Sequence, residues 1–196
     1  MSERNEQGTS LQVHDLTPLE FFDGYTTEEL RELIPYLRRY TYVPEEGPIF
    51  HEDLARKGIQ LILEGEVRIV KVVSEEHGLL LATLRRGEIF GEASMFDRGP
   101  HTSTVEAGER TETVAITREV YHEQLVKEQP HLAERIARHA AQVLSERLRQ
   151  ANETVMTYAI WTRSLQQASP PTRWRWYPLS TTSNLQARDL DKSAGT

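Results

Sequence analysis

The sequence has no cysteine, and this absence excludes several kinds of site. Without thiols the chain has no disulfide, no thiolate zinc centre and no cysteine nucleophile. It also lacks any apolar run close to the roughly 20 residues that cross a bilayer, and its first residues are polar. We therefore expect a soluble, cytoplasmic protein with no transmembrane segment. Its 196 residues are enough to bury a hydrophobic core without disulfide bonds or a structural metal ion.

The motifs of several enzyme classes are missing as well. The sequence contains no nucleophile elbow, no phosphate-binding loop and no paired catalytic carboxylates. Its seven histidines include no His-x-His pair, and His131 and His139 would stand two helical turns apart, too far for one metal ion. We therefore predict a protein that is not an enzyme and that has no catalytic residues and no metal site.

The formal charge of −7 is unevenly distributed along the chain. Residues 1–60 hold twelve acidic and six basic side chains, whereas residues 169–196 hold two and four. An acidic N-terminal third argues against a broad nucleic-acid surface on the body of the protein. Only the C-terminal tail is basic.

The N-terminal part of the chain predicts a mobile end and two helices. Residues 1–14 are polar with little periodicity, which is typical of a mobile N-terminus. Residues 16–25 carry a threonine cap, a proline and a terminal glycine, which favour a short helix. A second helix is expected from Thr26 or Thr27, and Pro35 should kink or end it.

From Tyr40 the apolar period changes to two, which predicts β-strands separated by turns. Many short strands at regular spacing indicate a sandwich or barrel, and eight is the count of a double Greek-key jelly roll. We therefore predict an α+β fold, a jelly roll flanked by N-terminal helices and a long C-terminal helix. The eight expected strands are residues 40–43, 48–50, 58–63, 66–73, 79–84, 88–90, 103–107 and 112–116.

Helical periodicity returns after the strands. One helix is expected over residues 118–127, followed by the break Glu128-Gln129-Pro130 and a helix from about His131 to Gln167. Apolar residues of the long helix approach a heptad seam, which favours association with another surface over packing on the N-terminal helices of the same chain. The seam residues are Leu144, Leu148, Ala151, Val155, Tyr158, Thr162 and Leu165. This gives four parts: 1–14, a domain over 15–128, the dimerisation helix over 129–168, and a flexible tail over 169–196.

The most informative stretch is residues 87–105. Gly87 and Gly91 bracket a short strand, residues 93–96 have room for one helical turn, and Asp97-Arg98-Gly99-Pro100 is a loop sequence. The N–H groups at the start of a helical turn can hold a phosphate with little help from side chains.

This stretch resembles the phosphate-binding cassette of the cyclic-nucleotide-binding domain, which occurs in bacterial Crp/Fnr regulators and in cyclic-nucleotide-gated kinases and channels. The resemblance extends over roughly residues 16–150, and it points to a parallel homodimer along the long helix. It implies that Glu92 holds the ribose of a cyclic nucleotide such as cAMP or cGMP, although no ligand is required for the fold. The residues that it places at the ligand are Gly91, Glu92, Ala93, Ser94, His101, Thr102 and Ser103.

Three residues depart from the pattern of that family. Asp53 replaces a common glycine, Ser103 replaces an alanine, and His101 replaces the arginine that pairs with the phosphate. Histidine is mostly neutral near pH 7 and lacks the planar fork of arginine. Losing one charged hydrogen bond costs about 1.5–3 kcal/mol, or roughly a ten- to hundredfold loss of affinity. Arg85, Arg86 and Arg98 are alternative cations, although a solvated surface role is the better interpretation for them.

The chain after Gln167 has fewer than thirty residues, which is too few for the helix-turn-helix domain of Crp/Fnr transcription factors. We therefore expect no DNA binding by that route. The tail carries Arg173-Trp174-Arg175-Trp176, which is suited to nucleic-acid stacking, a membrane interface or an anionic partner, or to docking on the same protein or its dimer mate.

Two functions are consistent with these patterns. The first is a regulatory protein that senses a cyclic nucleotide or a similar anion, even weakly, and signals through its long helix to an unidentified protein partner. The alternative is a dimeric scaffold whose pocket no longer binds a ligand.

Overall fold

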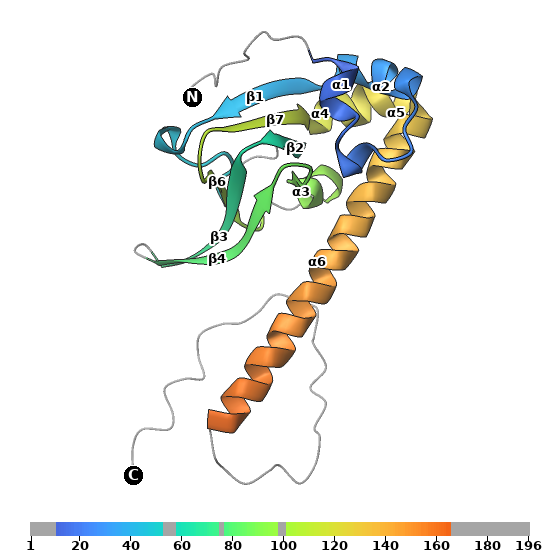
Figure 1. Cartoon of the computed structure of the whole chain (residues 1–196). Helices are drawn as coiled ribbons and strands as arrows, with labels where there is room; N and C mark the ends of the chain where they lie inside the picture. Colours follow the sequence, from blue (N-terminus) through green and yellow to red (C-terminus); the bar gives the residue numbers. More distant parts are fainter. Residues whose placement is uncertain (1–10, 53–57, 75–76, 98–100, 166–196) are drawn as a thin grey trace, which may run out of the picture. The chain divides into compact units, whose positions relative to one another are not determined.

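The computed structural model describes residues 11–52, 58–74, 77–97 and 101–165, and its strands form two antiparallel sheets (Figure 1). The four-stranded sheet has the order β1-β7-β2-β5, and the three-stranded sheet has the order β4-β3-β6. The strands are β1 (Arg38–Tyr42), β2 (Ile59–Glu64), β3 (Glu66–Ser74), β4 (His77–Arg85), β5 (Ile89–Phe90), β6 (Thr104–Ala107) and β7 (Thr111–Ile116).

Strand β2 is buried on both faces and contributes to two hydrophobic cores. Ile62 belongs to an inner core between the two sheets, together with Phe50, Val67 and Phe90. Ile59, Leu61 and Leu63 point the other way, because successive side chains of a strand alternate between faces, and they pack against the helices in an outer core. The inner and outer cores therefore share β2, and the short β5 also joins them, with Ile89 in the outer core and Phe90 in the inner one.

The expected strand at residues 48–50 is reduced to an isolated bridge between Phe50 and Val105. The backbone N–H groups of Ile49 and Phe50 converge on the same carbonyl of Val105, at 2.7 and 3.2 Å, so no regular ladder forms. Pro48 has no N–H group to extend the pairing. The described residues therefore form seven strands, and the prediction of eight is not confirmed, whereas the antiparallel sheets and flanking helices are.

The predicted helix over residues 16–25 is wrong. The structure has helix α1 (Val13–Leu16), which begins inside the predicted N-terminal segment 1–14, and a separate 3₁₀ turn (Glu20–Phe22). The helix ends before Pro18 because proline cannot donate the next intrahelical hydrogen bond.

The second N-terminal helix is confirmed as α2 (Thr27–Leu33). The Thr26 side chain accepts from the Glu29 N–H at 3.2 Å, and the Glu29 carboxylate accepts from the Thr26 N–H at 2.7 Å, which completes a capping box. As predicted, Pro35 ends the α-helix, and it lies in a 3₁₀ turn (Ile34–Tyr36).

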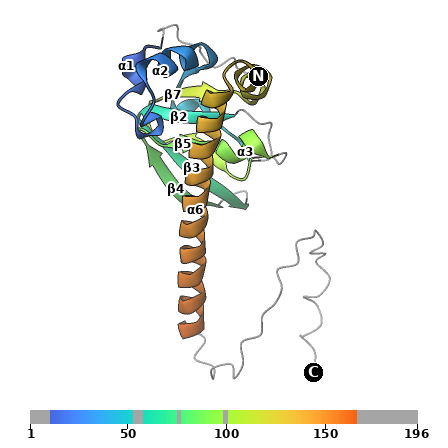
Figure 2. The same cartoon turned by 90° about the vertical axis from the view of Figure 1, so that its right-hand side faces the viewer.

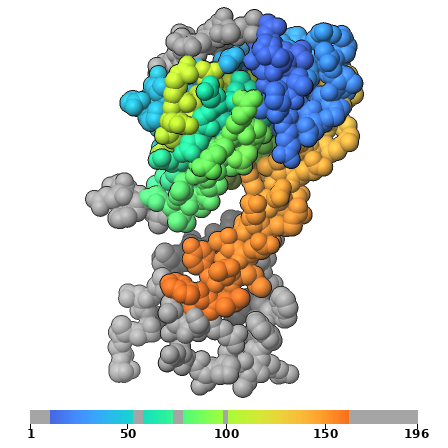
Figure 3. Space-filling view, in the orientation of Figure 1, coloured from blue at the N-terminus to red at the C-terminus, as the bar shows by residue number. Residues whose placement is uncertain are grey.

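The C-terminal helices begin directly after β7 with α4 (Arg118–Val120), a π-helical turn (Tyr121–Leu125) and α5 (Val126–Glu128). The long helix α6 (Pro130–Leu165) begins one residue before the predicted start, and its predicted end lies outside the described residues. Its first turns lie against the N-terminal helices, where blue and yellow side chains meet in the space-filling view (Figure 3), and Arg135 pairs with Glu29 at 2.9 Å. None of the described helices is long and apolar enough to span a membrane.

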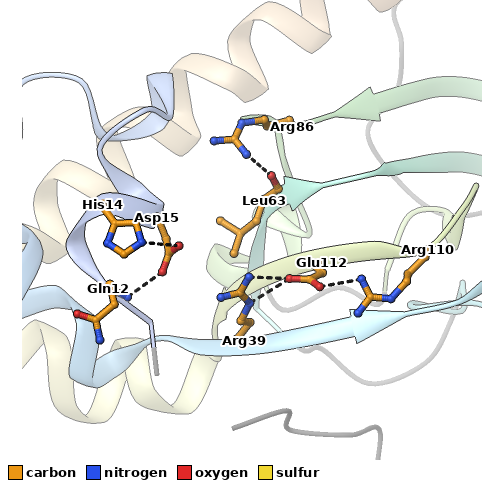
Figure 4. Close-up of polar contacts among 8 residues, drawn as sticks. All are labelled: Gln12, His14, Asp15, Arg39, Leu63, Arg86, Arg110 and Glu112. Carbon is orange, nitrogen blue, oxygen red and sulfur yellow. Dashed lines mark hydrogen bonds and ion pairs between the residues drawn. The ribbon is translucent and has the colours of Figure 1, made fainter. Parts of the chain in front are cut away.

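A half-buried ion pair ties β1 to β7 at one edge of the four-stranded sheet (Figure 4). Glu112 accepts from Arg39 at 2.6 Å and from Arg110 at 2.8 Å. The hydrogen bond from Arg39 keeps the pKa of the Glu112 carboxyl below its usual value. Because this pKa is lowered on folding, the stabilisation is present above the unfolded pKa and is lost as the pH falls through the folded one.

Candidate functional site

The predicted cassette folds as β5, the short helix α3 (Glu92–Phe96) and β6, and Gly91 forms the turn between the first two. Gly91 has a φ angle of 81°, in the left-handed region that favours glycine. A Cβ atom at this position would lie 2.3 Å from the Gly58 carbonyl oxygen and 2.7 Å from the Phe50 ring. Glycine is therefore required both by the backbone angle and by the space.

Glu92 is the first residue of α3, and its side chain is 6% exposed. Its Oε1 atom accepts from Nη1 of Arg147 at 2.5 Å, while Nη2 of the same guanidinium donates to the Ile89 carbonyl at 2.6 Å. Figure 2 shows α6 passing beside β5 and α3, which is where this contact is made. The carboxylate that the sequence predicts at the ribose is thus bound to the long helix.

Arg147 was not among the predicted site residues. It is separated from Glu92 by 55 positions, and no spacing rule links a helix that distant to a particular carboxylate. The long helix with an arginine was visible in the sequence, but the rotation that places Arg147 against α3 depends on tertiary packing.

The other predicted residues of α3 are mostly committed to the fold. Ser94 is buried, and its hydroxyl donates to the Gly91 carbonyl at 2.9 Å. At the opposite end of α3, Arg118 donates to the carbonyl of Met95, and His122 lies 3.1 Å from the same oxygen. The C-terminal end of α3 is thus anchored through the Met95 carbonyl to the helices that follow the sheets.

His101 lies inside the protein, with 6% of its surface exposed. Its ring stacks on that of Phe50, with centroids 4.4 Å apart and planes 18° from parallel. Since Phe50 also fills the space beside Gly91, the two ends of the cassette meet at this ring. No pattern in the sequence predicts that Phe50 joins them.

Thr102 and Ser103 follow His101 toward β6. The Thr102 side chain is exposed and Ser103 is half-buried, and the Thr102 carbonyl accepts from Lys71 Nζ at 3.0 Å. The same ammonium group pairs with Glu52, and this hydrogen bond lowers the pKa of the Glu52 carboxyl. Lys71 and Glu52 are therefore two further charged groups at the cassette that sequence reasoning missed.

The arginines considered as substitutes for the missing phosphate ligand have other partners where they are described. Arg85 lies 3.5 Å from Glu66, and Arg86 donates to the Leu63 carbonyl at 2.7 Å (Figure 4). Arg98 lies outside the described residues, as do Asp53 and the tail over residues 169–196. Within the described residues, no group of three or more histidine, aspartate or glutamate side chains could hold a metal ion.

Comparison with known proteins finds one matching family and similar relatives. The family model described as "Cyclic nucleotide-binding domain" matches residues 41–144, just over half of the chain. The cyclic AMP receptor protein of Thermus thermophilus is 33% identical over 131 residues, which are 67% of this chain and 58% of the relative. The chain therefore spans less than two thirds of the length of this relative.

Two solved structures have a similar fold. The catabolite activator protein of Thermus thermophilus superposes with a TM-score of 0.60 at 31% identity, over 71% of this chain and 62% of the other. A cyclic nucleotide-binding domain from Methylobacillus flagellatus superposes with a TM-score of 0.62 at 24% identity, over 74% and 81% of the two chains. The sheets and flanking helices are thus shared with proteins of this kind.

Proposed function

The chain belongs to the cyclic nucleotide-binding domain family, and from this premise we propose that it is a regulatory protein that senses a cyclic nucleotide or a similar anion. Binding would be signalled through α6 to a protein partner. The observation that carries this proposal is the bidentate contact of Arg147 with Glu92 and with the Ile89 carbonyl.

Glu92 connects the ligand to the long helix in this proposal. A ribose hydroxyl that donates to Glu92 approaches a carboxylate that already holds α6 through Arg147. The free energy of ligand binding and the position of α6 therefore depend on one shared group, which is the requirement for coupling between two sites. A ligand with different contacts in two positions of α6 would shift the balance between them.

The remaining predicted residues would hold the phosphate. The start of α3, with Gly91, Ala93 and Ser94, offers backbone N–H groups, while Thr102 and Ser103 add hydroxyl groups. His101 contributes no guanidinium fork, so we expect binding to be weak. No cofactor is needed for the fold itself.

The test is isothermal titration calorimetry with cAMP and cGMP on the wild-type protein and on His101→Arg. We expect weak binding to the wild type and affinity tighter by about ten- to a hundredfold in the variant, because arginine adds a charged, bidentate hydrogen bond. His14→Arg, at an exposed histidine, controls for the added charge. The proposal is wrong if neither nucleotide binds to either folded protein.

We also propose that the protein is a homodimer through α6. Several apolar side chains of the helix are more than half exposed in the single chain: Leu148, Val155, Met156, Tyr158, Ile160 and Trp161. Leu148, Val155 and Tyr158 follow the heptad spacing of a coiled-coil seam.

Light scattering at micromolar concentration should give the mass of a dimer for the wild type. Val155→Glu should give a monomer, because it places a charge in the seam, whereas Gln142→Glu, on the opposite face of the helix, should remain dimeric. A wild-type monomer under these conditions would rule out the dimer.

The alternative function is a dimeric scaffold that binds no nucleotide. It is favoured by the state of two site residues, since His101 is buried under Phe50 and Glu92 already has Arg147 as a partner. The calorimetric experiment separates the two functions, because the scaffold predicts no binding of either nucleotide to the wild type or to His101→Arg.

A further inference from the structure

We propose that Lys71, on β3, supplies the positive charge that the phosphate of a bound cyclic nucleotide meets, and that Glu52 competes with the phosphate for it. This inference rests on the proposed function, because it assigns a binding residue to the same site. It concerns a residue outside the segment 87–105 that carries the sequence resemblance.

The strand register places Lys71 on the inner side of the three-stranded sheet. Val67 is fully buried in the inner core and Ile69 packs partly against it, and the period of two continues to Lys71. Val70 pairs with Thr104, so Lys71 lies beside the residues that precede β6. Its ammonium group is 3.0 Å from the Thr102 carbonyl oxygen, next to His101 in the chain.

The ammonium group of Lys71 is positioned by hydrogen bonds, but the side chain remains accessible to solvent. Glu52 accepts from Lys71 and from the Val72 N–H at 3.4 Å, and the Glu52 side chain is only 14% exposed, compared with 45% for Lys71. An ammonium group has three donors on a flexible stem. Lys71 can therefore keep the Thr102 carbonyl while it turns a donor from Glu52 to an incoming anion.

The imidazole of His101 is poorly suited to the same task. Its ring is buried and stacked on Phe50, and an imidazole does not offer the planar fork that matches a phosphate. Within the described residues, Lys71 is a cation whose charged group contacts the backbone of the cassette directly after His101. The geometry therefore points to a lysine in place of the arginine that the family pattern carries.

The test measures cAMP binding by calorimetry in the wild type and three variants. Lys71→Gln should weaken binding at least tenfold, and Glu52→Gln should tighten it several-fold, because a neutral amide competes less strongly for the ammonium group than a carboxylate does. Arg68→Gln removes a cation from the same strand on its exposed face, so it should bind as the wild type does. Adenosine, which has no phosphate, should bind the wild type and Lys71→Gln equally.

Two further outcomes keep this inference separate from the proposed function. Because Lys71→Gln leaves the Glu52 carboxylate without its cation, the double variant Glu52→Gln/Lys71→Gln provides a neutral pair, and it should bind cAMP more weakly than Glu52→Gln alone. Equal affinity in the wild type and Lys71→Gln, or in this pair of variants, would overturn the role of Lys71 while cAMP binding stands. Absence of binding to the wild type and to His101→Arg would instead overturn the proposed function and this inference with it.

Discussion

Replacing Arg147 by methionine is expected to lower the free energy of unfolding by about 2–4 kcal/mol, because it leaves the Glu92 carboxylate buried without its cation. The Glu92 side chain is 6% exposed and that of Arg147 is 32% exposed, so solvent screens the pair only in part. Urea denaturation at pH 7, followed by circular dichroism, measures this difference.

A matched control for this variant lies two residues further along the same helix. Arg149 is exposed, so Arg149→Met removes an equal charge and should change the stability by less than about 0.5 kcal/mol. Glu92→Gln/Arg147→Met should recover part of the loss, since no unpaired charge remains. If Arg147→Met and Arg149→Met unfold at the same urea concentration, Arg147 does not hold α3 to α6 in solution.

Gly91→Ala is expected to destabilise the protein by about 2–5 kcal/mol. An alanine at a φ angle of 81° costs about 1–2 kcal/mol, and forcing an extra carbon into a filled space adds about 1–3 kcal/mol. The new Cβ atom would meet the Gly58 carbonyl oxygen at 2.3 Å and the Phe50 ring at 2.7 Å. The melting temperature and urea midpoint should both fall.

Gly87→Ala measures the energetic cost of the backbone angle without the cost of the steric clash that Gly91→Ala adds. Gly87 has a φ angle of 88°, but a Cβ atom there would have no heavy atom within 4 Å apart from Gly87 itself and its two neighbours in the chain. It should therefore cost only about 1–2 kcal/mol, from the backbone angle alone. Equal losses in the two variants would contradict the close packing of Phe50 against Gly91.

Much of the fold could be predicted from the sequence because it depends on local patterns. The alternation of apolar and polar residues predicted the strands, and the turn glycines predicted the breaks between them. Thr26 and Pro35 predicted the limits of α2. Predictions were wrong where contacts between residues far apart in the sequence determine the local structure. Residues 48–50 have the sequence pattern of a strand, but the N–H groups of Ile49 and Phe50 both donate to the carbonyl of Val105.

The candidate site was predictable only in part for the same reason. The motif located Gly91 and Glu92, whose neighbours in the chain shape the turn. It did not predict that Arg147 would bind Glu92, that Phe50 would cover His101, or that Lys71 would reach Thr102. These contacts join residues on different elements, and a single sequence shows which face a side chain occupies but not which partner it meets there.

The burial of β2 on both faces links the unfolding of the inner core to that of the outer core. Neither the inner nor the outer core can come apart without exposing one side of this strand, so the two cores should unfold as one cooperative unit. If a ligand binds at the cassette as proposed, we expect β2 to couple it to the helices in addition to Arg147. We therefore expect the amide protons of β2 to exchange with solvent only when the whole domain unfolds.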